Sequence, residues 1–172
     1  LARDRTLLVN VFEFLCFLSS HFDILITFFR FIHYHFAENN NLAGSLPDEI
    51  SALHSLKVLS LEKGFISGLI PSFIGRLSQL EILDLDFNSL SGLLPPELSQ
   101  LSNLKLLDLN DNDLMGSLDA LSGLDNIQFL KLHSTKIGGT VPPAFGNFIG
   151  LKALTLQDTF VHGSMPASVC QL

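Results

Sequence analysis

The chain has 172 residues, of which 47% are hydrophobic and 16% charged, so it can form one domain with a core and is too apolar for wholesale disorder. Its formal net charge is −7 and its Lys and Arg residues are scattered, which argues against a nucleic-acid-binding surface. Two cysteines, Cys16 and Cys170, are too few for a disulfide framework or a zinc site. Because the chain begins with Leu, we expect a fragment or a processed product.

Residues 1–31 are rich in Phe and contain neither Gly nor Pro, so a helix is the easiest local structure for them. The stretch 7–32 is apolar enough to raise a membrane helix, but Glu13 near its middle nearly cancels the insertion free energy of the apolar side chains. No small-residue cleavage site follows, which disfavours a signal peptide. Three interpretations stay open: a poorly inserted anchor, an apolar cap, or a segment without stable order. We expect a helical flank that caps the next domain or associates with a membrane.

From residue 32 onward the pattern L-x-x-L-x-L-x-x-N-x-L-x-G-x-x-P-x-x-L-x-x-L recurs six times. The copies span 32–55, 56–79, 80–103, 104–126, 127–150 and an incomplete 151–172. The glycine is present in all six copies, as Gly44, Gly68, Gly92, Gly116, Gly139 and Gly163. The proline is present in five, as Pro47, Pro71, Pro95, Pro142 and Pro166, whereas the fourth copy has Asp119 and is one residue short. Chance would not keep both residue types in phase.

Each position of the pattern has a structural reason. The L-x-x-L-x-L run alternates like a strand, and stacked copies would pair into a parallel sheet over a continuous core. The Asn position, filled by Asn40, Asn88 and Asn112, can bond backbone groups freed where the chain turns. Half the copies lack this amide, and we expect a weaker ladder at those positions, which hold Gly64, Thr135 and Thr159. Gly and Pro then turn the chain into 3₁₀ or extended segments, and the short fourth copy predicts a tighter coil whose convex side lies closer in.

This pattern resembles the leucine-rich repeat, and LAGSLP at 42–47 and ISGLIP at 66–71 are similar to its plant-type variety, L-x-G-x-[IL]-P. The resemblance covers 32–172 and implies an α/β solenoid. Such a fold is a right-handed superhelix of six repeats of 23–24 residues, with a parallel sheet on the concave side and short 3₁₀ or irregular convex segments. The resemblance also implies a non-catalytic module without a cofactor that binds proteins or peptides on the concave sheet.

The plant-type variety resembles ectodomains of receptor-like proteins and receptor kinases, which implies a place at the cell surface or outside the cell. The sequence contains no kinase motif. The absence of an Asn-x-Ser/Thr sequon and the few cysteines keep an alternative open, an intracellular, cytoplasmic scaffold or structural repeat protein. Family members often end in a cap that carries cysteines, so Cys170 could pair with a cysteine beyond this chain; we slightly prefer a buried free thiol.

The repeat places columns of side chains on the outer surface of the predicted sheet. The first column is apolar and reads Val58, Ile82, Leu106, Phe129, Ala153. The second reads Ser60, Asp84, Asp108, Lys131, Thr155, and the third reads Glu62, Asp86, Asn110, His133, Gln157. A fourth column, at the strand ends, reads Lys63, Phe87, Asp111, Ser134, Asp158. From these columns we predict a face for a partner with basic and apolar groups, made of Val58, Ile82, Leu106, Phe129, Glu62, Asp84, Asp86, Asp108, Asn110, Asp111, Lys131 and His133.

Simpler interpretations of these residues remain. Asp84 and Asp108 match a position where the resemblance implies a consensus Asp, and Val, Ile and Phe favour strands whatever the ligand. We expect no metal site, because the Asp- and Asn-rich run 110–113 lacks the glycine and final glutamate of a calcium loop. His33 and His35 likewise lack further ligands, and no nucleophile elbow is present.

Overall fold

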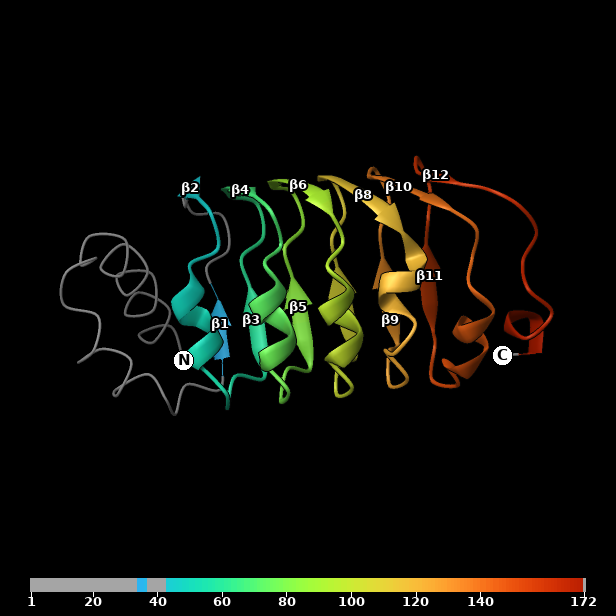
Figure 1. Ribbon diagram of the computed structural model, residues 1–172, viewed down its shortest axis with the longest axis horizontal. Helices are drawn as coiled ribbons and strands as arrows, with labels where there is room; N and C mark the ends of the chain where they lie inside the picture. Colours follow the sequence, from blue (N-terminus) through green and yellow to red (C-terminus); the bar gives the residue numbers. More distant parts are fainter. Residues whose placement is uncertain (1–33, 37–42, 172) are drawn as a thin grey trace.

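The computed structural model describes residues 34–36 and 43–171, which form one row of stacked coils (Figure 1). Each coil opens with a short strand, and these strands pair in parallel in the order β1-β3-β5-β7-β9-β11. Their bounds are Tyr34–Phe36 (β1), Val58–Ser60 (β3), Ile82–Asp84 (β5), Leu106–Asp108 (β7), Phe129–Lys131 (β9) and Ala153–Thr155 (β11). Successive strands begin 24, 24, 24, 23 and 24 residues apart, as the repeat spacing predicts.

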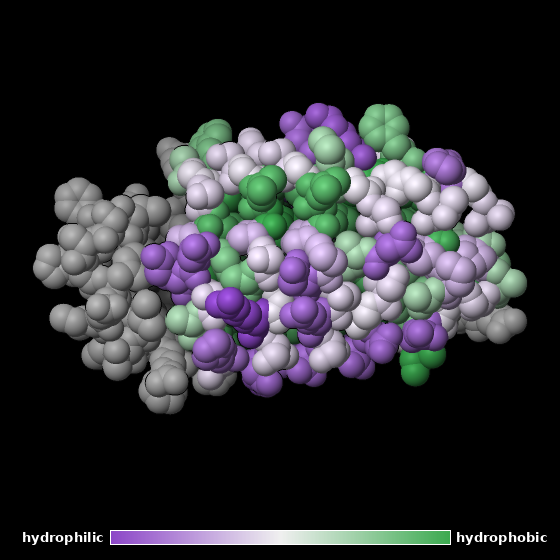
Figure 2. Space-filling model, in the orientation of Figure 1, coloured by the Kyte–Doolittle hydropathy of each residue, from purple (hydrophilic) through white to green (hydrophobic). Residues whose placement is uncertain are grey.

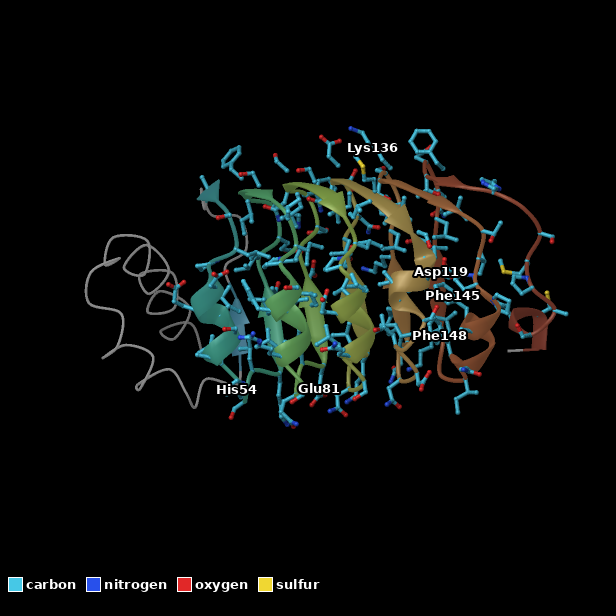
Figure 3. All side chains as sticks on the ribbon, in the orientation of Figure 1. His54, Glu81, Asp119, Lys136, Phe145 and Phe148 are labelled. Carbon is cyan, nitrogen blue, oxygen red and sulfur yellow. The ribbon has the colours of Figure 1, made fainter. Side chains whose placement is uncertain are left out.

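The register of this sheet confirms the predicted phase of the repeats. Leu59, Leu83, Leu107, Leu130 and Leu154 are direct neighbours across the strands. The first four are buried and Leu154, in the last strand, is partly buried. A single apolar core runs through the stack and includes the ring pair Phe145 and Phe148, whose centroids lie 4.5 Å apart (Figure 3). Each coil therefore completes its burial against its neighbours.

A second parallel sheet, which the sequence did not predict, runs along the upper edge of the stack in Figure 1. Its order is β12-β10-β8-β6-β4-β2. The bounds are Ala43–Gly44 (β2), Phe65–Gly68 (β4), Ser89–Leu93 (β6), Asp113–Ser117 (β8), Lys136–Gly139 (β10) and Phe160–Val161 (β12). The repeat glycine lies within five of these strands and, as Gly163, two residues after β12, and all six glycines have φ between +79° and +108°, a region that favours Gly.

The chain crosses the convex side of the described coils in 3₁₀ helices. The predicted α/β solenoid fold, with short 3₁₀ segments on its convex side, is therefore confirmed. The helices are Asp48–Ala52 (η1), Ser72–Arg76 (η2), Pro96–Gln100 (η3), Leu118–Leu121 (η4), Pro143–Asn147 (η5) and Val169–Gln171 (η6). The repeat proline directly precedes η1, η2, η3 and η5 with φ from −79° to −67°, and the Pro166 carbonyl accepts the first-turn N–H of η6. Proline thus marks the start of five of these six helices.

The fourth coil is shortened but does not interrupt the stack. Its helix η4 has four residues, against five in η1, η2, η3 and η5, and Ser117 rather than proline caps it by accepting the Asp119 N–H at 3.0 Å. Strand β8 of this coil pairs with both β6 and β10. That the convex side of this coil lies closer in stays a prediction.

Several predictions fall on residues outside the described part of the chain. They concern the helical flank 1–31, the membrane association of 7–32, Cys16, His33 and Asn40. Between residues 43 and 171, no helix is both long and apolar enough to cross a membrane. Cys170 is a free thiol, but the expectation that it is buried is wrong, because its side chain is exposed.

Candidate functional site

The first two predicted columns lie in the strands of the first sheet, and the third lies two residues beyond the strand ends. We call the surface that these three columns form the concave face. In the first column Val58 is buried, while Ile82, Leu106, Phe129 and Ala153 keep part of their surface exposed. Neighbouring members of the column pair directly across the sheet. The column is therefore a continuous apolar stripe, and Lys152 places its Nζ 5.7 Å from the centre of the Phe129 ring at one end.

The fourth column is a turn rather than part of the strands. Lys63, Phe87, Asp111, Ser134 and Asp158 all have φ between +49° and +55°, a left-handed conformation that non-glycine residues seldom adopt. Their backbone N–H groups bond the carbonyl of the next coil in four of five cases, as in Phe87 to Asn110 at 3.1 Å. The turn directs the following residue, the repeat Asn, back into the stack.

The Asn ladder forms where the sequence has Asn. The Asn112 Nδ2 donates to the carbonyls of Leu85, Leu109 and Asn110 at 2.9, 3.2 and 3.0 Å, and its Oδ1 accepts the Leu90 N–H at 2.9 Å. Asn88 makes the equivalent set of bonds one coil earlier.

The positions without Asn contribute fewer of these bonds, as predicted. Thr135 and Thr159 each donate only to the carbonyl three residues earlier, at 2.7 Å. Thr159 also accepts the Val161 N–H at 3.4 Å, within its own coil. Gly64 has no side chain to contribute. Neither threonine hydroxyl bonds an adjacent coil among the residues that the structure describes.

The acidic residues of the predicted face form a compact cluster and two ion pairs. Carboxylate oxygens of Glu62, Asp84 and Asp86 all lie within 4.8 Å of one another. Burial raises the pKa of Asp84 to about 7, helped by the nearby charge of Asp108, and the same two causes raise the pKa of Asp86 to about 6. We call Glu62, Asp84 and Asp86 the carboxylate cluster.

The remaining predicted polar residues are engaged within the protein. Asp108 is buried and accepts a hydrogen bond from the Lys131 Nζ at 2.8 Å, which raises the pKa of Lys131 above its usual range. Asn110 is also buried, with its Oδ1 on the backbone N–H of His133 at 2.8 Å. The His133 Nε2 lies 3.3 Å from the Asp111 Oδ2. Among the predicted binding residues, Val58, Asp108 and Asn110 therefore offer little surface to a partner.

Other charged residues lie away from this face. Figure 3 shows Glu81 at the lower edge of the stack, where its carboxylate lies 3.5 Å from the Lys57 Nζ and 2.6 Å from the Lys105 Nζ. The hydrogen bond from Lys105 holds the pKa of Glu81 below its usual range. Figure 3 also shows Lys136 at the upper edge; its Nζ lies 2.8 Å from the Asp113 Oδ1. These pairs link adjacent coils or strands and leave the concave face to the groups described above.

The convex side carries its own apolar surface. Figure 2 shows apolar side chains over the upper part of this side between β4 and β8, where Leu69 and Leu93 are exposed. Beside Leu93 lies a hollow of about 330 Å³ that is also lined by Asp119 and Ser117. This hollow adjoins the coil without the repeat proline.

Comparison with known proteins agrees with the fold. The family described as Leucine rich repeat matches residues 54–114, and a second leucine-rich-repeat family matches residues 126–148. The ectodomain of the receptor kinase SOBIR1 from Arabidopsis thaliana is 31% identical, with a TM-score of 0.73 over 77% of this chain and 72% of that one. The chain belongs to the leucine-rich repeat family. No curated protein sequence matches it significantly.

Longer leucine-rich-repeat ectodomains are equally similar. The plant membrane receptor kinase GASSHO1/SCHENGEN3 from Arabidopsis thaliana, in complex with CASPARIAN STRIP INTEGRITY FACTOR 2, is 31% identical, with a TM-score of 0.79. The plant peptide hormone receptor RGFR1, in complex with RGF2, is 32% identical, also with a TM-score of 0.79. Both alignments cover 82% of this chain but only 17% and 23% of the receptors. The resemblance to receptor-like leucine-rich repeats of the plant type is thereby confirmed.

Proposed function

We propose that this chain is a non-catalytic recognition module that binds a protein or peptide on its concave face, at the cell surface or outside the cell. The single observation that carries the proposal is the apolar stripe on the first sheet, with the carboxylate cluster next to it at the ends of β3 and β5. The complexes formed by the structurally similar receptor ectodomains support the same class of partner.

The chemistry of the face selects the kind of partner. Ile82, Leu106 and Phe129 are partly exposed and would bury apolar side chains of a ligand. The neighbouring carboxylates favour Lys or Arg on that ligand, because opposite charges steer association and select register. An extended peptide laid across the strands can present both kinds of side chain to adjacent columns. The preferred ligand is therefore a peptide that alternates apolar and basic residues.

A displayed random-peptide library, selected on the full chain, tests this proposal. The selected peptides should be enriched in basic and apolar residues. They should lose about 10-fold or more in affinity for the double variant Ile82→Glu/Leu106→Glu, because two buried apolar contacts are replaced by charge.

The matched control is Leu69→Glu/Leu93→Glu, which makes the same change on the convex side and should leave affinity unchanged. Circular dichroism establishes that both variants are folded. Peptides that keep their affinity for the concave variant, or lose it only with the convex one, contradict the proposal.

A further inference from the structure

The carboxylate cluster has a geometry that peptide recognition does not require. Glu62 belongs to one coil, and Asp84 and Asp86 to the next, yet each offers one oxygen within 4.8 Å of the other two. A calcium ion accepts several carboxylates in irregular geometry, at about 2.3–2.6 Å. A magnesium ion demands a near-ideal octahedron and is usually held by only one or two carboxylates. Three carboxylates contributed by two coils therefore favour the calcium-type ion.

A second observation points to a missing partner. The Oδ1 of Asp86 is buried and has no hydrogen-bond partner among the residues that the structure describes, and the side chain of Asp86 is the buried one of the three. Buried carboxylate oxygens are normally bonded or coordinated, because an unpartnered one forfeits its hydration. The other nearby acid, Asp108, has Lys131, and Asp84 accepts the Asp86 N–H at 3.3 Å through its Oδ1. The unpartnered oxygen thus belongs to one of the three carboxylates of the cluster.

The net charge of the ionisable groups around the carboxylate cluster is one that a divalent cation would neutralise. Four carboxylates gather here, those of Glu62, Asp84, Asp86 and Asp108. Two ammonium groups face them: Lys63, 3.2 Å from Glu62, and Lys131, 2.8 Å from Asp108. When all six groups are ionised, two negative charges remain uncompensated, which is the charge that one divalent cation supplies.

We propose that Glu62, Asp84 and Asp86 form a binding site for a calcium-type divalent cation on the concave face. The three carboxylates supply the protein ligands, and water completes the coordination on the open side of the face. The ion bridges two coils, so binding stabilises the contact between the β3 and β5 coils. The proposal is independent of the peptide-recognition proposal, because it concerns the protein with Ca²⁺ alone.

Isothermal titration of the full chain with CaCl₂, after treatment with a chelator, tests the site. One ion should bind with a dissociation constant of about 10⁻⁴ M, as expected for an open site with few ligands. The thermal midpoint should rise with Ca²⁺ and fall back when chelator is added. Asp86→Asn and Asp84→Asn should each weaken binding about 10-fold or more, since each replaces a charged ligand. Because both changes relieve repulsion, neither variant should melt below the wild type in chelator.

The control variant Asp113→Asn removes the same charge from β8 on the second sheet and should leave Ca²⁺ binding unchanged. Three outcomes overturn the proposal: no binding at about 10 mM Ca²⁺, well above the range of weak extracellular sites; equal weakening in Asp113→Asn; or binding that survives both Asp84→Asn and Asp86→Asn. Stabilisation by arginine amide without any response to Ca²⁺ also overturns it, and assigns the cluster to an organic cation.

Discussion

Replacing Asn112 by Ala tests the ladder that holds adjacent coils in register. The side chain makes four hydrogen bonds, but two of its carbonyl partners keep another donor: Leu85 retains the Asn88 Nδ2 at 3.1 Å, and Asn110 retains the Phe87 N–H at 3.1 Å. The Leu90 N–H and the Leu109 carbonyl lose the partner that Asn112 supplied. At about 1–3 kcal/mol for each of these two buried unpaired groups, the change should cost about 2–6 kcal/mol.

Urea unfolding followed by circular dichroism measures this loss for a graded series. Asn112→Thr should cost about half as much, because its hydroxyl can bond the carbonyl three residues earlier, as Thr135 does. The control, Asn103→Ala, removes one exposed bond to the Ser78 carbonyl and should cost under about 1 kcal/mol. If Asn112→Ala is no more destabilising than Asn103→Ala, the ladder is not what holds these coils together.

Three further predictions concern packing and charge. Gly75→Ala should destabilise by about 1–3 kcal/mol, because its new Cβ would lie 2.7 Å from the Glu97 carbonyl oxygen, whereas Gly150→Ala, with no atom nearer than 3.8 Å, should be nearly neutral in the same urea assay. In chelator, the free energy of unfolding should fall as the pH rises from about 4 to about 7. The raised pKa values of Asp84 and Asp86 mean that the folded state binds more protons than the unfolded state in that window. A thermal midpoint that does not change with pH over this window would contradict the prediction. Lys131→Met should cost about 2 kcal/mol at pH 7 in the urea assay by leaving the buried Asp108 without its ammonium partner, and a cost below about 0.5 kcal/mol would refute the explanation.

The first sheet was predictable because its signal is repeated and local. Leu-x-Leu alternation sets which side chains point inward, and the constant spacing aligns Leu59 with Leu83 and Leu107. The turn prolines and glycines were predictable for a related reason, since few residues satisfy the dihedral angles they adopt.

The second sheet had no such signal. Its strands are short, rich in Ser and Gly, and carry no apolar alternation, so only the stacking of the coils brings β4 against β6. The left-handed turn residues were also missed, because Lys63, Phe87 and Ser134 share no chemistry and their backbone angles are imposed by the coil. Glycines such as Gly75 are required by the approach of the next coil, a contact between repeats that no single repeat reveals.

The candidate site was predictable as a surface but not in its detail. The repeat placed the acidic residues on one face, yet it could not show that Asp108 would be buried against Lys131. Nor could it show that Asp86 would keep an unpartnered oxygen. Both depend on side-chain directions across two coils, separated by 22 to 24 residues in sequence.

The most direct test of the recognition surface is photo-crosslinking. A peptide selected on the full chain, carrying a benzophenone in its apolar position, would be irradiated in complex and the attachment sites mapped by mass spectrometry. The account predicts attachment at Ile82, Leu106 or Phe129, on the strands of the first sheet. Attachment confined to Leu69, Leu93 or Phe160, outside that sheet, would contradict it.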